Sequence, residues 1–238
     1  MIILINIISY LERHFMKQQI FIVGDSTAAI KADDKRPETG WGEKFPQFIS
    51  AQYQVNDFAF NGASTKTFLK RGVLKDINQK IKPNDYLLIQ FGHNDQKIED
   101  PDWGTSISEY QKNLTKFINF AKHHGAISIV LSSIIRRNYQ DGQLVNTLGD
   151  YPKAAKECAN ANDTFFIDMN QVTFDYVKLQ TPEESKKLWL NVDHSANYPN
   201  GVHDNTHLNN YGATIIAKLT ALELAKLQTP LAKAITLK

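Results

Sequence analysis

Residues 20–27 read Ile-Phe-Ile-Val-Gly-Asp-Ser-Thr, and this stretch sets the expected fold. Four apolar residues, enough for a buried strand, end at Gly24, and Ser26 follows two positions later. A strand that ends in such a corner can hold a serine hydroxyl exposed at the edge of a sheet, where a nucleophile is useful. Gly-Asp-Ser is also ordinary turn chemistry. The stretch therefore needs support from other parts of the chain.

Apolar runs of strand length alternate with amphipathic stretches along the rest of the chain. This alternation predicts an α/β fold, a three-layer α/β/α sandwich with a five-stranded parallel sheet. No repeat or linker divides the sequence, so we expect one domain over residues 16–238, with residues 1–15 as an extension outside it. The predicted strands are Gln19–Val23, Gln54–Phe60, Asp85–Phe91, Ala126–Ser132 and Thr164–Asp168.

Two helices stand out in the pattern. Residues 106–124 carry apolar side chains on one face, with Ser106 and Glu109 spaced as a capping box and Gly125 at the C-terminal end. Residues 208–227 predict a closing helix, followed by a short tail over residues 229–238.

Composition narrows the class of protein. The chain has 238 residues, 42% of them hydrophobic, and a formal net charge of +2, which argues against nucleic acid or a membrane surface as partner. A single cysteine, Cys158, excludes an intrachain disulfide and is expected to be a packed thiol. The apolar residues 2–8 lack the flanks of a secretory signal, so we expect a cytoplasmic protein.

Polar residues follow three of the predicted strands, at 24–26, 61–64 and 92–95. Ligands of open parallel sheets bind beyond the carboxyl ends of the strands, near the point where strand order reverses. With the flavodoxin-like order 2-1-3-4-5, these three ends are neighbours and Ser26 lies between the other two. A fourth polar segment, 203–207, lies in a predicted loop before the last helix, where Asp204 can reach His207 and orient its imidazole as a base.

Four blocks in this order resemble those of the SGNH (GDSL-like) hydrolases, and their details resemble the rhamnogalacturonan acetylesterase branch. The resemblance covers roughly residues 21–224. The segments that carry it are Gly24-Asp25-Ser26-Thr27-Ala28, Gly40-Trp41-Gly42, Gly62, Gln90-Phe91-Gly92-His93-Asn94-Asp95-Gln96, and Asp204-Asn205-Thr206-His207 with Tyr211-Gly212-Ala213 after it.

The resemblance implies a serine esterase that removes O-acetyl groups from carbohydrate, an acetylated rhamnogalacturonan fragment above all, without a metal or organic cofactor. Ser26 would be the nucleophile, His207 the general base and then acid, and Asp204 its orienting partner. The oxyanion donors would be the backbone N–H groups of Ser26 and Gly62 and the side-chain amide of Asn94. Asn61 and Ala63 flank Gly62, whereas many relatives have an arginine or a second glycine after it.

Predicted substrate contacts are Trp41, at the cleft wall, and Ser64. Arginine pairs well with a carboxylate, so Arg71, Arg136 and Arg137 are candidates to bind galacturonate. We expect structural roles for three further polar residues: Asp25 closes a turn, His93 packs at a strand end, and Asp95 caps a helix or loop.

Other interpretations of the same residues remain open. The esterase could act on a xylan-type saccharide or on another short-chain ester. A histidine- and carboxylate-rich set could bind zinc and make the protein a metal-dependent hydrolase; it consists of Asp193, His194, His203, Asp204 and His207. A non-catalytic flavodoxin-like module with an anion nest at residues 24–27 would leave the Asp204/His207 pair unexplained.

Overall fold

The computed structural model describes residues 17–237 of the chain. Its central sheet has five parallel strands in the order β2-β1-β3-β4-β7, the predicted order 2-1-3-4-5. The predicted extension over residues 1–15 lies outside the described residues. The strands are β1 (Gln18–Gly24), β2 (Tyr53–Asp57), β3 (Tyr86–Gln90), β4 (Ile127–Leu131) and β7 (Phe165–Ile167).

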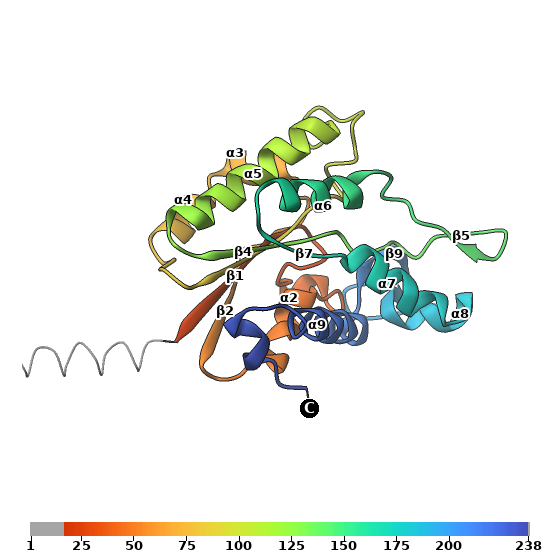
Figure 1. Ribbon diagram of the computed structural model, residues 1–238. Coiled ribbons are helices and arrows are strands. Elements are labelled where there is room, and N and C mark those ends of the chain that lie inside the picture. Colours follow the sequence, from red (N-terminus) through yellow and green to blue (C-terminus); the bar gives the residue numbers. More distant parts are fainter. Residues whose placement is uncertain (1–16, 238) are drawn as a thin grey trace, which may run out of the picture.

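Helices cover both faces of this sheet, so the predicted three-layer sandwich is confirmed (Figure 1). One layer contains α3 (Thr65–Arg71), α4 (Leu74–Asn78), α5 (Ile107–His123) and α6 (Tyr151–Ala161). The opposite layer contains α2 (Trp41–Lys44), α7 (Met169–Lys178) and α9 (Asn210–Leu224). Short helical segments complete the fold: α8 (Pro182–Ser185), η1 (Asp33–Lys35), η2 (Phe45–Phe48), η3 (Lys186–Leu188) and η4 (Pro230–Ala234).

The central strands separate two apolar cores because successive side chains of a strand point to opposite faces. In β1, Ile20 and Ile22 pack toward α2 and α9, whereas Phe21 and Val23 pack toward α3 and α5. All four side chains are fully buried. This burial on both faces explains why the strand reads as a continuous apolar run, and it holds the end of β1 at a fixed position.

Helix α5 lies where the sequence predicts it, with most of the expected end signals. The Ser106 hydroxyl accepts a hydrogen bond from the backbone N–H of Glu109 at 3.2 Å, and Gly125 lies beyond the C-terminus at φ +67°. The capping box is only half formed, because the Glu109 carboxylate reaches Lys66 at 3.5 Å instead. The expected apolar face, from Tyr110 to Ala121, is buried against the sheet.

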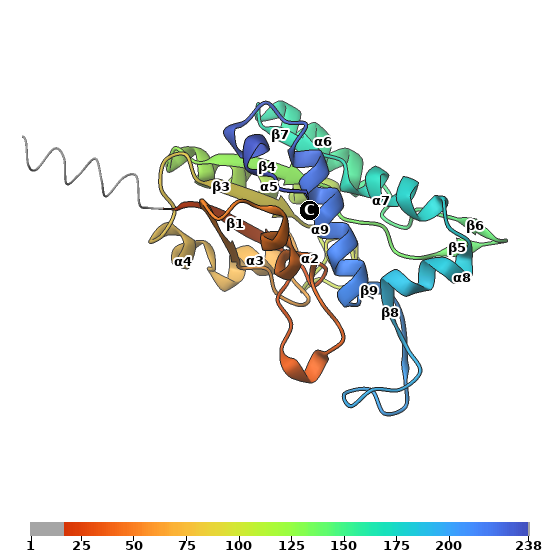
Figure 2. The ribbon, with the colours of Figure 1, turned by 90° about the horizontal axis from the view of Figure 1, so that it is seen from below.

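The prediction of a loop over residues 203–207 is wrong, because this segment belongs to strand β9 (Val202–Leu208). It pairs antiparallel with β8 (Trp189–Val192) in a hairpin that projects from the sandwich beside the loop over residues 30–40 (Figure 2). The closing helix therefore begins at Asn210, not at residue 208. A second small hairpin joins β5 (Tyr139–Gln140) and β6 (Gln143–Leu144).

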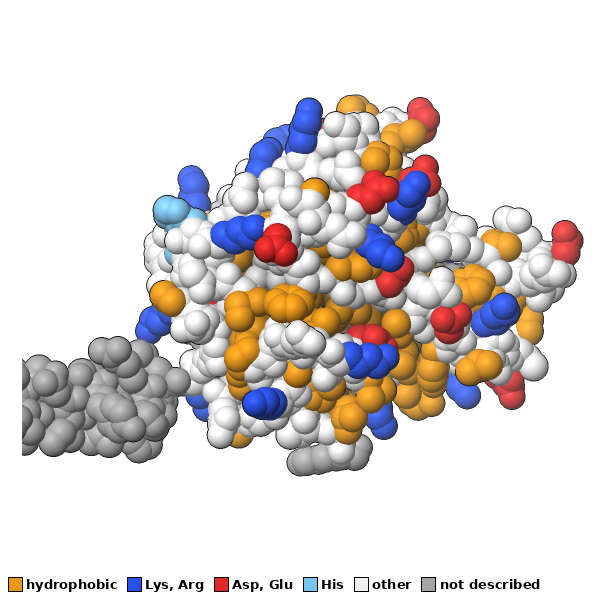
Figure 3. All heavy atoms as spheres, in the orientation of Figure 1, with side chains coloured by type: hydrophobic (Ala, Val, Ile, Leu, Met, Phe, Trp, Pro, Cys, Tyr) orange, Lys and Arg blue, Asp and Glu red, His pale blue; other side chains and the backbone are white. Residues whose placement is uncertain are grey.

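The predicted tail packs against the domain. Leu231 is fully buried, and its backbone N–H donates to the Tyr86 hydroxyl at 3.1 Å. On the face seen in Figure 3, acidic and basic side chains are intermixed and apolar side chains gather across the middle. None of the helices within residues 17–237 has the length and hydropathy needed to cross a bilayer.

Candidate active site

Ser26 lies in a tight turn directly after β1. The Asp25 carboxylate accepts hydrogen bonds from the Thr27 backbone N–H at 2.9 Å and from its hydroxyl at 2.8 Å, as predicted for a residue that closes a turn. Gly40 packs against the same turn so closely that a Cβ there would lie 2.1 Å from the Ala29 carbonyl oxygen. The turn is thus held from within and from the neighbouring segment, and only 7% of Ser26 is exposed.

Asp204 and His207 reach Ser26 from the β8–β9 hairpin, 181 residues further along the chain in the case of His207. The His207 Nε2 atom lies 2.9 Å from the Ser26 Oγ, and the His207 Nδ1 atom lies 2.6 Å from the Asp204 Oδ2. The other Asp204 oxygen accepts from the backbone N–H groups of Thr206 at 2.7 Å and His207 at 2.9 Å. This geometry sets the tautomer, with Nδ1–H donating to the carboxylate and Nε2 free to accept the serine proton.

A register shift in the hairpin explains how a strand can bring the two side chains together. Asn191 of β8 pairs with His203, whereas Trp189 pairs with Leu208, so β9 contains extra residues between the two pairs. Such bulges redirect side chains and often lie beside active sites. The shift places Asp204 and His207 on the same side of the hairpin.

The pair also shifts the acidity of both groups. Burial alone would raise the pKa of Asp204, but the hydrogen bond and charge of His207 outweigh it and lower the pKa to about 2. Burial alone would lower the pKa of His207, but the Asp204 carboxylate outweighs it and raises the pKa above 6.5. The carboxylate is therefore ionised at neutral pH and favours a positive charge on the ring.

Gly62 and Asn94 follow the strands on either side of β1. Gly62 has φ +75°, a conformation that a glycine adopts without strain. The Asn94 amide donates to the Ala63 carbonyl at 2.9 Å, and its oxygen accepts from the Lys97 ammonium at 2.8 Å. An ammonium can only donate, so the Asn94 atom that faces Lys97 must be the amide oxygen. One N–H of the Asn94 NH₂ group is used by Ala63, and the second is left for another acceptor.

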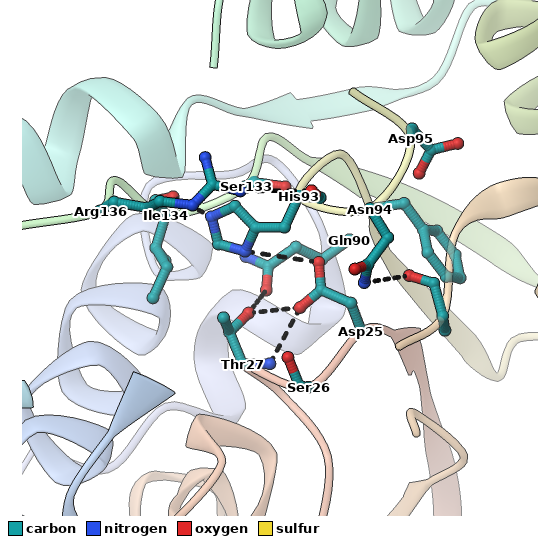
Figure 4. A network of polar contacts seen from close by, with 12 residues as sticks. Asp25, Ser26, Thr27, Gln90, His93, Asn94, Asp95, Ser133, Ile134 and Arg136 are labelled. Atoms are coloured by element: carbon teal, nitrogen blue, oxygen red, sulfur yellow. Dashed lines mark hydrogen bonds and ion pairs between the residues drawn. The ribbon is translucent and has the colours of Figure 1, made fainter. Parts of the chain in front are cut away.

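Beneath the turn lies a buried polar network (Figure 4). Asp25 is completely buried, with one carboxylate oxygen 3.6 Å from the His93 Nδ1 atom. The opposite ring nitrogen of His93 lies 2.8 Å from the Ile134 carbonyl oxygen. Burial would raise the pKa of Asp25, but His93 and Thr27 outweigh it, so the pKa is lowered. The network supports the turn, as predicted for Asp25 and His93.

Lys31 is a buried residue beside Ser26 that the sequence analysis missed. Its ammonium donates to the Ser26 carbonyl oxygen at 2.5 Å and to the Asn61 side-chain oxygen at 2.6 Å, and pairs with Glu38 at 2.8 Å. All three donors of the ammonium are thus used. Lys31 ties the Ser26 turn to the segment before Gly62, and the polar Asn61 provides one of the contacts. No motif signals this role, because an isolated lysine is usually exposed.

Two predicted substrate contacts are wrong, because both side chains are completely buried. The Trp41 indole N–H donates to the Gln90 side-chain oxygen at 2.7 Å, and its ring packs edge-on against Phe45. Ser64 is the N-cap of α3 and accepts from the Thr67 backbone N–H at 3.2 Å. Both residues stabilise the scaffold of the site.

The three candidate arginines differ in their surroundings. Arg71 is exposed, with its guanidinium 4.5 Å from the centre of the Phe60 ring. Arg136 donates to the side chains of Gln96 and Thr147, and burial lowers its pKa. The Arg137 guanidinium donates to Ser185, the Asn205 side chain and the Pro182 carbonyl. The guanidinium groups of Arg136 and Arg137 are thus engaged within the protein.

Asp95 is a buried cap, as predicted. Its carboxylate accepts from the Thr65 backbone N–H at 3.1 Å at the start of α3 and from the Thr105 hydroxyl at 3.0 Å. Burial raises its pKa to about 6. Cys158, also buried as predicted, lies with its sulfur 3.4 Å from the Gln111 carbonyl oxygen, and burial raises its pKa.

The histidine- and carboxylate-rich set considered as a zinc site does not converge. His194 contacts the Pro199 carbonyl, and His203 is exposed with its ring nitrogen 3.4 Å from Asn191. Among residues 17–237, no three His, Cys, Asp or Glu side chains are placed to bind one metal ion.

Comparison with known proteins identifies the family. Residues 22–215 match the GDSL-like Lipase/Acylhydrolase family. The chain belongs to this family. The resemblance and the enzyme class stated from the sequence, a carboxylic ester hydrolase, are thereby confirmed.

Two curated proteins of Bacillus subtilis match nearly the whole chain. Rhamnogalacturonan acetylesterase RhgT is 40% identical over 216 residues, which cover 90% of this chain and 92% of RhgT. Probable rhamnogalacturonan acetylesterase YesY is 29% identical over 92% of this chain and 98% of YesY.

Solved structures confirm the fold. The crystal structure of YXIM_BACsu from Bacillus subtilis superposes with a TM-score of 0.76 at 26% identity, covering 88% of this chain and 56% of that protein. Axe2, an acetylxylan esterase from Geobacillus stearothermophilus, superposes with a TM-score of 0.63 at 18% identity, covering 87% of this chain and 94% of Axe2. At this identity, the Axe2 match bears on the fold alone.

Proposed function

We propose that this protein is a serine acetylesterase that removes O-acetyl groups from acetylated rhamnogalacturonan fragments. The observation that carries the proposal is the continuous hydrogen-bonded chain Ser26–His207–Asp204, whose geometry suits activation of a serine nucleophile. The 40% identity to rhamnogalacturonan acetylesterase RhgT supports the substrate class. Acetylated xylo-oligosaccharides are the second candidate substrate, because Axe2, a protein of similar fold, is an acetylxylan esterase.

In the proposed reaction, His207 accepts the Ser26 proton at Nε2 while the Ser26 Oγ attacks the acetyl carbonyl. The imidazolium that forms is stabilised by the ionised Asp204 carboxylate. His207 then gives its proton to the departing sugar oxygen as the bond between that oxygen and the acetyl carbon breaks, which frees the sugar hydroxyl and leaves an acetyl group on Ser26. A water molecule deprotonated by His207 attacks the acetyl carbonyl. As the bond to the Ser26 Oγ breaks, His207 returns the proton to that oxygen, which releases acetate and restores the free serine.

The negative charge of the tetrahedral intermediate would be held by the backbone N–H groups of Ser26 and Gly62 and by the Asn94 amide. A glycine at position 62 keeps side-chain atoms away from the substrate carbonyl. Lys97 and the Ala63 carbonyl hold the Asn94 amide in one orientation before substrate binds. Donors positioned in advance stabilise the developing charge without a further cost of reorganisation.

Replacement of Ser26 by alanine gives the most direct test. We expect the Ser26→Ala variant to lose about 10⁶-fold in kcat, since removal of the nucleophile disables the whole catalytic unit. Acetate release should be measured with acetylated rhamnogalacturonan oligosaccharides, acetylated xylo-oligosaccharides and ethyl acetate. A fluorophosphonate probe should label the wild type and not the variant.

Each result bears on a different part of the proposal. If the wild type prefers the xylo-oligosaccharides, the proposed substrate is wrong and the proposed reaction still stands. Full activity of Ser26→Ala would overturn the role of the serine. Loss of activity with EDTA, restored by zinc, would favour a metal-dependent reaction instead.

A further inference from the structure

We propose that Trp103 is a specificity-determining residue that forms a stacking platform for the sugar ring bearing the acetyl group. This inference rests on the proposed carbohydrate esterase function. It is carried by three observations: the exposure of the indole, its position beside Gly62, and the rigid loop that holds it.

Trp103 differs from the other two tryptophans of the chain in its exposure. It is 39% exposed, whereas Trp41 and Trp189 are 0% and 1% exposed and belong to the core. A large apolar side chain that stays partly in water contributes less to the stability of the fold than a buried one. Binding of a ligand that covers the side chain recovers this difference in free energy.

The indole lies at the edge of the proposed oxyanion site. A Cβ atom added to Gly62 would lie 3.5 Å from the Trp103 Nε1 atom, an ordinary van der Waals distance. Because glycine has no side chain, nothing at position 62 screens the indole from a group bound at the Gly62 N–H. An acetyl ester held there would bring its alcohol portion within reach of the ring.

The loop that holds Trp103 is fixed by its own hydrogen bonds. The backbone N–H groups of Trp103 and Gly104 donate to the Asp100 carbonyl at 3.2 and 2.7 Å. The Lys66 ammonium, from α3, donates to the Gly104 carbonyl at 2.6 Å and to the Pro101 carbonyl at 3.3 Å. A platform that is already ordered loses little conformational entropy when a ligand binds.

The same loop also contributes to the Asn94 donor. Lys97 lies at its start and holds the Asn94 oxygen at 2.8 Å. One short segment after β3 therefore orients an oxyanion donor at one end and places an exposed indole beside Gly62 at the other. This arrangement links the position of the ester carbonyl to the position of the sugar that carries it.

An indole suits a sugar ring because both are amphipathic. Its flat face can contact the C–H face of a pyranose, while its N–H can donate to a hydroxyl at the ring edge. A small acetyl ester without a ring has no surface to cover the indole. Trp103 should therefore distinguish carbohydrate esters from simple ones.

Kinetics with two kinds of substrate test the inference. We expect Trp103→Ala to lose about 10- to 100-fold in kcat/KM for acetylated rhamnogalacturonan oligosaccharides, mainly through a higher KM. This is the loss typical of an aromatic side chain that becomes buried when its ligand binds. Activity on ethyl acetate should stay within about twofold, and Trp103→Phe should retain most of the activity on the oligosaccharides. Leu179→Ala, which shortens an exposed apolar side chain at the end of α7, is the control.

Fluorescence gives a readout that does not depend on turnover. Because Trp41 and Trp189 are buried, binding of a deacetylated oligosaccharide to Ser26→Ala should change mainly the Trp103 emission. The change should disappear in Ser26→Ala/Trp103→Phe.

An equal loss on ethyl acetate and oligosaccharide, or no loss on either, would overturn the platform while leaving the esterase function standing. A wild type that hydrolyses ethyl acetate and no acetylated oligosaccharide would instead overturn the proposed function, and this inference with it.

Discussion

The two halves of the candidate site are built in different ways. Ser26 lies at the end of the central sheet, above the buried Asp25–His93 network and beside the buried Lys31. Asp204 and His207 lie on a two-stranded hairpin outside that sheet, with 28% and 30% of their side chains exposed. The proposed nucleophile is thus part of the core, whereas the proposed base is brought to it by a peripheral element.

Buried side chains at the base of the hairpin, Trp189 and Leu208, pack into the core, and polar contacts attach its outer part to the rest of the domain. Arg137 donates its backbone N–H to the Asn205 carbonyl at 2.8 Å and its guanidinium to the Asn205 side chain at 3.1 Å. Near the tip, the Asn197 amide donates to the carbonyls of Asp33 and Arg36 at 2.7 and 2.9 Å. Because Asp204 and His207 are partly exposed, their substitution should change chemistry more than stability, whereas substitution of the buried residues around Ser26 should change both.

The largest effect within this comparison is expected for Asp204→Asn. The amide keeps the shape of the side chain but removes the charge that stabilises the imidazolium, so kcat should fall about 10⁴-fold. As the proposed base, His207 must be neutral to accept the proton, so the wild-type rate should decline as pH falls through the His207 pKa, which lies above its ordinary value. Without the carboxylate, burial remains as the main influence and lowers the pKa of His207, so the acid limb should move to lower pH.

Rate–pH profiles of wild type and variant, with urea denaturation of both, check this prediction. An acid limb at the same pH in both proteins would contradict the assignment of that limb to His207.

A smaller effect on activity is expected for Asn94→Ala, on the Ser26 side. Loss of one oxyanion donor should lower kcat about 10²- to 10³-fold. Loss of the hydrogen bond to Ala63 should lower the free energy of unfolding by about 1 kcal/mol. Stopped assays of acetate release and thermal denaturation measure the two quantities.

Asn113→Ala provides a matched control for this variant. Asn113 is also a buried asparagine, its amide donates to Thr65, and its oxygen accepts from a lysine three residues later. The control should lose similar stability and keep its activity. A comparable loss of kcat in both variants would indicate that destabilisation, and not a lost oxyanion donor, explains the effect.

The smallest effect on activity, with the largest on stability, is expected for Lys31→Met. The variant leaves Glu38 buried without its cation and should lower the free energy of unfolding by about 3–5 kcal/mol. Loss of the contacts to Ser26 and Asn61 should lower kcat about tenfold, because the nucleophile is less precisely positioned. Urea denaturation and steady-state kinetics test both parts.

The double variant Lys31→Met/Glu38→Gln separates the two effects. Removal of the unpaired charge should restore part of the stability and none of the lost kcat. Full recovery of kcat in the double variant would show that Lys31 acts through stability alone.

Much of the central sheet could be predicted because strands buried on both faces must be apolar throughout, whereas its strand order was taken from the flavodoxin-like topology. The runs at residues 20–23 and 86–89 follow this rule, and the short polar segments after them define the edge where a site can form. The ends of β1, β2 and β3 were expected to lie together for the same reason, since topology brings the ends of parallel strands together. The contact between Ser26 and His207 was instead expected from the resemblance to the SGNH hydrolases.

The hairpin was missed because its strands carry no periodic signal. Residues 203–207 are all polar, and they form a strand only because residues 189–192, folded back across the turn, supply hydrogen-bond partners. Lys31 was missed for a related reason. A lysine is buried only where several acceptors converge on it, and its three acceptors come from separate segments of the chain.

By itself, the sequence determined the three-layer fold and the residue types that an ester hydrolase requires, because both follow from local patterns of apolar and polar residues. The tertiary structure alone decided which of the predicted contact residues are buried and which other side chains stay exposed at the site. It buried Trp41 and Ser64 as parts of the scaffold and left Trp103 exposed beside Gly62. Exposure and distance depend on packing between segments far apart in the chain, which no local pattern contains.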